Sequence, residues 1–105
     1  MKYMLLIYET EEGWGDSQLT QRLKSHGNYL GAQLRTTGSA TSIRIRNGER
    51  LPTDGPFAET QEQLCGYYII EAEHLDEALD IASQIPSARF GTVEVRPIVE
   101  STRAI

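Results

Sequence analysis

The sequence is poor in the residues that build disulfide frameworks and metal centres. It contains one cysteine, Cys65, and two histidines, His26 and His74, among 105 residues. A single cysteine cannot form an internal disulfide, and isolated histidines without a cysteine pair do not make a zinc site. We therefore expect no bound metal, and we interpret Cys65 as a small residue at the start of a buried strand.

Cationic residues are also scarce. Ten Lys and Arg residues stand against fifteen Asp and Glu residues, which gives a net charge of −5. The basic cluster formed by Arg44, Arg46 and Arg50 is interrupted by Glu49. Because a negatively charged surface repels phosphate backbones, we predict no nucleic-acid partner.

Membrane-spanning and cofactor-binding motifs are missing as well. The opening stretch MKYMLLIY is apolar but covers only residues 1–8, which is too short to span a bilayer. No glycine-rich phosphate loop follows a predicted strand, and no serine stands in a nucleophile elbow. We expect a cytoplasmic protein with no membrane contact and no cofactor.

The patterns that are present indicate a single domain over residues 1–105. Apolar runs at 1–8 and 67–72 and an alternating segment at 92–99 predict strands. Residues 75–85 have the apolar spacing of a helix that Pro86 ends. The segment TSIRIRNGERLPT predicts a β-hairpin, because Asn47-Gly48 suits a two-residue turn with positive φ at both positions. That turn places Arg46 opposite Glu49.

The first helix has two possible ends. It begins at Asp16 or Ser17 and either stops at His26, with Gly27 as its left-handed terminal residue, or continues to Thr36. The longer helix carries two internal glycines at about 1 kcal/mol each. We prefer the shorter helix, followed by a strand at residues 28–34, and we interpret His26 as a residue whose charge suits the helix C-terminus.

The order strand, helix, strand, hairpin, strand, helix, strand is that of an α+β ferredoxin-like split β-α-β fold with an inserted β-hairpin. Two helices cover one face of a four-stranded sheet. The strands at 1–8 and 67–72 are apolar on both faces, so the second face exposes side chains that are worth about 1.5–3 kcal/mol each when buried. We therefore predict a homodimer that packs sheet against sheet.

The stretch TDGPFAETQEQLCGYYIIEA at residues 53–72 is similar to the signature of DGPF-domain proteins in the YCII-related family. MKYMLLIY, TSIRIRNGE, LTQRLKSHGNYL and HLDEALDIASQIPSARFGTVEVRPI look like the same family. The resemblance implies a dimeric α+β-barrel assembly but no settled reaction. YCII-type relatives have a histidine near the start of the first helix, and His26 lies at the other end, so the His–Asp pair proposed for them is not transferred here.

Asp54 has a structural and a chemical interpretation. In Asp54-Gly55-Pro56-Phe57, the aspartate can accept a backbone hydrogen bond within a turn, and this is the interpretation we favour. If the turn carries a site, Asp54 is the candidate acid or base. Its neighbours in that site would be Arg44 or Glu59, which orient a small polar or anionic ligand, and Phe57, Tyr67 or Tyr68, which line the cleft.

Three functions remain open at this point. The first is a small-molecule-binding or enzyme-like homodimer with a cleft near the DGPF turn. The second is a non-catalytic interaction module, which the resemblance associates with sigma-factor regulation. The third is a divergent, inactive member of the family. Whether the protein is an enzyme is not decided by its sequence.

Overall fold

The computed structural model describes residues 1–10, 30–58 and 60–99. In chain order, the elements are the strands β1 (Lys2–Glu9) and β2 (Leu30–Gln33), the short 3-10 helix η2 (Thr37–Ser39), the strands β3 (Thr41–Arg46), β4 (Glu49–Asp54) and β5 (Gln63–Glu71), the helices α2 (Leu75–Gln84) and α3 (Ser87–Phe90), and the strand β6 (Thr92–Pro97). The expected first helix and His26 lie outside the described residues.

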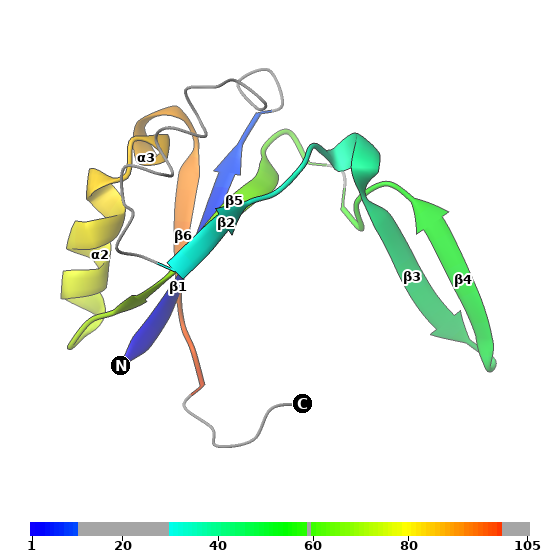
Figure 1. Ribbon diagram of the computed structural model, residues 1–105, viewed down its shortest axis with the longest axis horizontal. Helices are drawn as coiled ribbons and strands as arrows, with labels where there is room; N and C mark the ends of the chain where they lie inside the picture. Colours follow the sequence, from blue (N-terminus) through cyan, green and yellow to red (C-terminus); the bar gives the residue numbers. More distant parts are fainter. Residues whose placement is uncertain (11–29, 59, 100–105) are drawn as a thin grey trace.

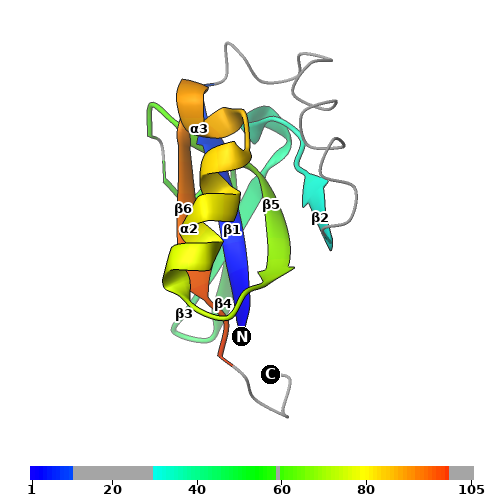
Figure 2. The same cartoon turned by 90° about the vertical axis from the view of Figure 1, so that its left-hand side faces the viewer.

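Four of the strands form an antiparallel sheet in the order β2-β5-β1-β6. The chain is therefore an α+β protein with a four-stranded sheet, and β3 and β4 form a separate two-stranded hairpin. Figure 1 shows α2 and α3 on one side of the sheet and the hairpin on the other. Figure 2 shows the same arrangement viewed from the side of the helices. No helix among the described residues is long and apolar enough to cross a membrane.

The core lies between the sheet and the helices. The residues of β1 that face the helices are buried, and they pack with buried residues of β5 and α2 and of the segments that directly follow these two elements. The cluster consists of Tyr3, Leu5, Ile7, Cys65, Tyr68, Ile70, Ala72, Ala78, Ala82 and Ile85. Val93 and Val95 of β6 pack against this cluster, as expected. Cys65 is fully buried in β5, which confirms its interpretation as a small core residue.

The other face of the sheet is only half covered. Five half-buried side chains from β1 and β5 lie on it, and together they are called the open sheet face: Met4, Leu6, Tyr8, Tyr67 and Ile69. Among the described elements, neither a helix nor a strand packs over these side chains (Figures 1 and 2). Helices therefore cover one face, and the other face, which carries apolar and polar side chains, has no cover among the described elements.

Only part of the apolar stripe of α2 is buried. Its buried residues are Ala78 and Ala82, whereas Leu75 and Leu79 are 48% and 46% exposed. Two alanines allow the helix backbone to approach the sheet closely, and this leaves the bulkier leucines at the margin of the contact. The helix predicted from the apolar spacing is confirmed, and the alanines rather than the leucines are its buried residues.

The hairpin forms as predicted. Asn47 and Gly48 have φ values of 53° and 79°, and Arg46 is paired with Glu49 across the turn. The guanidinium of Arg46 donates to the carbonyl of Ile45 (2.9 Å). Pro52 is tolerated because both strands of a two-stranded sheet are edges.

Candidate functional site

The DGPF turn closes the root of the hairpin. Asp54 is the last residue of β4, and Gly55 follows it with a φ of 100°, a conformation that favours glycine. The amide of Gly55 donates to the carbonyl of Ala40 (2.7 Å), and the hydroxyl of Ser42 donates to the carbonyl of Gly55 (2.8 Å). These bonds fix the point at which both hairpin strands leave the main sheet.

Phe57 was expected to line the cleft beside the turn, but its side chain does not lie in apolar surroundings. Its side chain is 78% exposed, and the guanidinium of Arg44 lies over its ring, 5.1 Å from the centroid. Such a cation–π pair at an exposed site contributes about 0.5–1 kcal/mol. Two of the predicted site residues therefore meet, but on the surface of the hairpin root.

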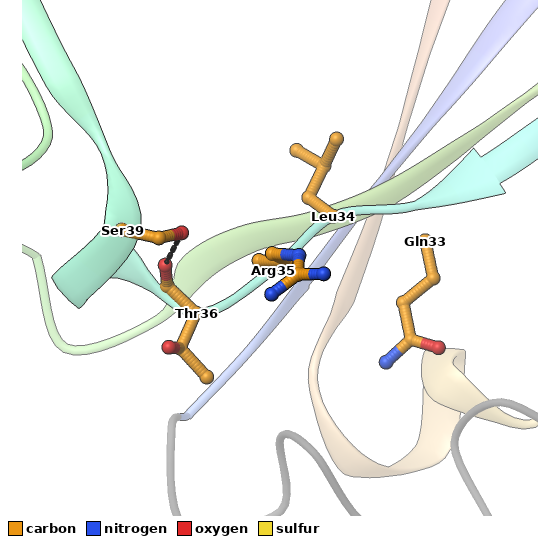
Figure 3. A pocket seen from close by; sticks show the side chains of 5 residues that line it. All are labelled: Gln33, Leu34, Arg35, Thr36 and Ser39. Atoms are coloured by element: carbon orange, nitrogen blue, oxygen red, sulfur yellow. Dashed lines mark hydrogen bonds between the residues drawn. The ribbon is translucent and has the colours of Figure 1, made fainter.

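A cavity of about 360 Å³ lies beside the turn. It is bounded by the segment that leads from β2 into the hairpin, by Pro56 and by the start of β5, and its lining residues are Leu34, Arg35, Thr36, Thr37, Ser39, Ala40, Pro56, Gln63 and Leu64. A second hollow of about 420 Å³ shares four of these residues and adds Gln33. Figure 3 shows these five side chains around the connecting segment, with the Ser39 hydroxyl donating to the Thr36 carbonyl (2.8 Å).

Arg35 is the positively charged residue that lines both hollows. Within the described part of the chain, its guanidinium has no ion pair or hydrogen bond. Arg35 is exposed, and it shares the lining of the smaller cavity with the apolar residues Leu34, Ala40, Pro56 and Leu64 and with four polar residues. A guanidinium in such a lining suits a ligand with a carboxylate or a similar anionic group, because its fork can pair with two oxygens at once.

The predicted site residues are distributed around this cavity rather than in its wall. Asp54 is exposed and lies two residues before Pro56, and its paired residue Thr41 follows Ala40. Tyr67 lies on the open sheet face, whereas Tyr68 is buried under the helices, so the two tyrosines cannot line one cleft. Glu59 lies outside the described residues.

Sequence reasoning missed the lining residues of the connecting segment. Residues 35–40 have the Thr, Gly and Ser content of a loop and were interpreted only as a connection. Arg35 was the available signal, because it is a lone cation directly after a short strand. Nothing in the local pattern indicates that this segment folds against Pro56, since that contact depends on the path of the hairpin.

Three hydrogen-bonded polar side chains lie side by side on the open sheet face. The Tyr8 hydroxyl donates to Glu94 Oε1 (3.1 Å), and Arg96 Nε donates to Glu94 Oε2 (2.6 Å). Burial and the bond to Glu94 raise the pKa of Tyr8, while the hydrogen bond from Arg96 holds the pKa of Glu94 below its usual range. Both shifts favour a neutral Tyr8 hydroxyl that donates to an ionised Glu94 carboxylate.

One group of possible metal ligands has a structural explanation. Ligand atoms of Glu73, His74 and Glu77 lie within 4.8 Å of one another. However, His74 Nδ1 accepts from the amide of Glu77 (3.2 Å), and Glu77 Oε2 accepts from the amide of Glu73 (3.3 Å). The group is the N-terminal cap of α2.

Almost the whole chain is similar to known proteins of one family. A family model described as the YCII-related domain matches residues 1–102. An uncharacterised protein of Rhizobium meliloti (strain 1021) is 43% identical over 94 residues, which cover 86% of this chain and 76% of that protein. Neither similarity carries a ligand or a reaction, so the function has to be argued from the cavity.

Proposed function

This chain belongs to the YCII-related domain family, and we propose its function from the residues beside its DGPF turn. The protein binds a small anionic molecule in the cavity at the root of the hairpin. It binds this molecule as a homodimer. The ligand class is a small carboxylate or phenolate. Its anionic group pairs with Arg35, and its apolar part lies against Leu34, Pro56 and Leu64.

The observation that carries the proposal is Arg35, which has no ion pair among the described residues and lines a cavity with both apolar and polar side chains. A volume of about 360 Å³ falls in the range of about 300–1,000 Å³ that small-molecule sites occupy. Such sites combine apolar walls with a few polar groups that fix orientation. Here those groups are Arg35, the Thr36 side chain and Ser39.

An enzymatic role would add Asp54 as acid or base. Asp54 is held at the end of β4 by the hairpin ladder, two residues before the lining residue Pro56. Its exposed carboxylate would accept a proton from a ligand held by Arg35. This step is a proposal beyond binding.

The open sheet face supports the homodimer. Half-buried apolar side chains on a sheet face usually mark an interface. Two ferredoxin-like domains with these faces together would form a dimeric α+β barrel, with the sheets about 10 Å apart.

Thermal-shift measurements with a panel of small aliphatic carboxylates, aromatic carboxylates and phenols test the binding proposal. A ligand at 100 times its dissociation constant adds about 2.7 kcal/mol to the free energy of unfolding, which raises Tm by several degrees. We expect Arg35→Gln to abolish the shift. Arg89→Gln is the matched control, because it removes the same charge from α3, outside the cavity and outside the hairpin.

The outcomes separate binding from catalysis. Asp54→Asn should keep the thermal shift and abolish turnover of any ligand that the wild-type protein converts. A shift of equal size in wild type and Arg35→Gln contradicts the proposed site, and a panel without any shift contradicts the ligand class.

A further inference from the structure

The hairpin of β3 and β4 stands away from the rest of the protein. Of its strand residues only Ser42 is not exposed, and β3 packs on β4 without comparable packing on any other described element. The Cα radius of gyration is 15.5 Å, whereas a compact chain of this length has about 13 Å. Figure 1 shows the hairpin projecting on the side of the sheet opposite to the helices.

One face of the exposed hairpin carries two isoleucines, and on the same face Arg50 is paired with Ile45. Ile43 and Ile45 are 54% and 63% exposed, and Pro52 is paired with Ile43 on the same face. A lone two-stranded hairpin is marginally stable in water, and it needs a further surface to pack on. The chain's own core does not supply that surface, because its helices lie on the opposite side of the sheet (Figure 2).

Charge favours a second copy as that surface. The hairpin carries three arginines against Glu49 and Asp54, which gives it a charge of +1. Since the whole chain carries −5, the remainder carries −6. A basic, apolar arm thus complements the acidic body of another molecule of this protein, and the arm extends on the same side as the open sheet face.

We propose that the β3–β4 hairpin is a dimerisation arm, which lies with Ile43 and Ile45 against the body of a second copy and is exchanged reciprocally across the two-fold axis. The inference rests on the proposed homodimer and adds the element that holds it together.

Shortening the arm tests this directly. Ser42 is paired with Thr53, so replacement of residues 43–52 by a two-residue Asn-Gly turn removes most of the arm and keeps the Ser42 hydrogen bond to the DGPF turn. Analytical ultracentrifugation of the full chain should show a dimer at micromolar concentration. The shortened chain, with unchanged far-ultraviolet circular dichroism, should dissociate at least about 100-fold more readily.

Point variants keep the test decisive if the shortened chain unfolds. Ile43→Ser with Ile45→Ser changes only exposed side chains and should weaken the dimer about tenfold or more. The matched control is Leu75→Ser with Leu79→Ser, a pair of exposed apolar residues on α2, at 48% and 46%. In a mixture of isotope-labelled and unlabelled protein, Ile43 and Ile45 methyl groups should show intermolecular nuclear Overhauser effects.

Each contrary result has its own meaning. A wild-type dimer whose dissociation constant is unchanged by the isoleucine variants, with no intermolecular effect at those methyl groups, overturns the arm and leaves the homodimer intact. A wild-type monomer at tens of micromolar overturns both, and the hairpin is then free for a different protein or an acidic polymer. Ligand binding in the thermal-shift panel is scored separately from either result.

Discussion

At the residue scale, two glycines are required by a neighbouring strand and not by a turn. A Cβ atom at Gly31 would lie 2.2 Å from the Tyr67 carbonyl oxygen, and one at Gly91 would lie 2.0 Å from the Tyr8 carbonyl oxygen. Backbone atoms cannot move aside as the end of a side chain can. The sheet therefore packs against these two positions at a distance that only glycine permits.

Substitution of these glycines should separate crowding from loss of flexibility. We expect Gly91→Ala to lower the free energy of unfolding by about 1–3 kcal/mol through overpacking. Gly38→Ala is the control, because nothing lies within 4 Å of its added Cβ, and its effect should stay within about 0.5 kcal/mol or be slightly stabilising. Urea denaturation measures both, and equal losses would contradict the close approach at Gly91.

Tyr68 predicts a loss of stability at high pH. Burial raises its pKa from 10.0 to about 12, so the folded state keeps the phenol neutral where the unfolded chain ionises. The stabilisation is complete below pH 10 and disappears as the pH rises toward 12, at up to about 1.4 kcal/mol per pH unit. Urea denaturation between pH 9 and 11.5 should show a steeper decline for wild type than for Tyr68→Phe. Parallel declines would contradict the assignment.

At the element scale, α2 begins at a cap that uses an unusual residue. His74 is the N-cap, and its Nδ1 accepts from the amide of Glu77, while Asp76 and Glu77 place negative charge in the first turn. Sequence reasoning located the start of this helix but assigned His74 no role. The imidazole replaces the side-chain oxygen that usually accepts this bond.

His74→Ala should lower the free energy of unfolding by about 0.5–2 kcal/mol, because it leaves the amide of Glu77 without its acceptor. His74→Asp should match or exceed the wild type, since aspartate is a preferred cap and its charge suits the helix N-terminus. Thermal denaturation at pH 7.5 compares the three proteins. An unchanged Tm in His74→Ala would show that the cap contributes nothing.

At the scale of the whole molecule, consecutive residues of β1 serve two different contacts. Leu5 is fully buried in the core, while its neighbour Leu6 lies on the open sheet face. Because adjacent side chains on a strand point to opposite faces, the same chemical change at the two positions reports on folding and on assembly separately.

We expect Leu5→Ala to lower the free energy of unfolding by about 2–5 kcal/mol at every protein concentration. Leu6→Ala should leave the folded protomer nearly as stable but should raise the dissociation constant of the proposed dimer, so its Tm falls more at low than at high protein concentration. Denaturation over a hundredfold concentration range measures both. A concentration-independent effect at Leu6 would contradict an interface on that face.

Local patterns were sufficient for most of the elements. The hairpin was predicted to the residue because Asn47 and Gly48 tolerate positive φ, and the apolar runs of β1 and β5 could only be buried strands. The helix α2 was predicted from its apolar spacing, but spacing does not say which of its apolar residues are buried, and the structure buries Ala78 and Ala82 while Leu75 and Leu79 stay exposed. Among the predicted site residues, Arg44 and Phe57 are in contact, whereas Tyr67 and Tyr68 lie on opposite faces of the sheet.

The sequence by itself determined the α+β class, the order of the strands along the chain, the hairpin turn and the family. Each of these follows from residues that are close in the chain, through periodicity, turn chemistry or a contiguous motif. Only the tertiary structure decided that residues 34–40 meet Pro56 around Arg35, and that the hairpin leaves the body as an exposed arm. These features depend on the direction in which the chain leaves β2 and β4, and that direction is set by contacts between segments distant in sequence.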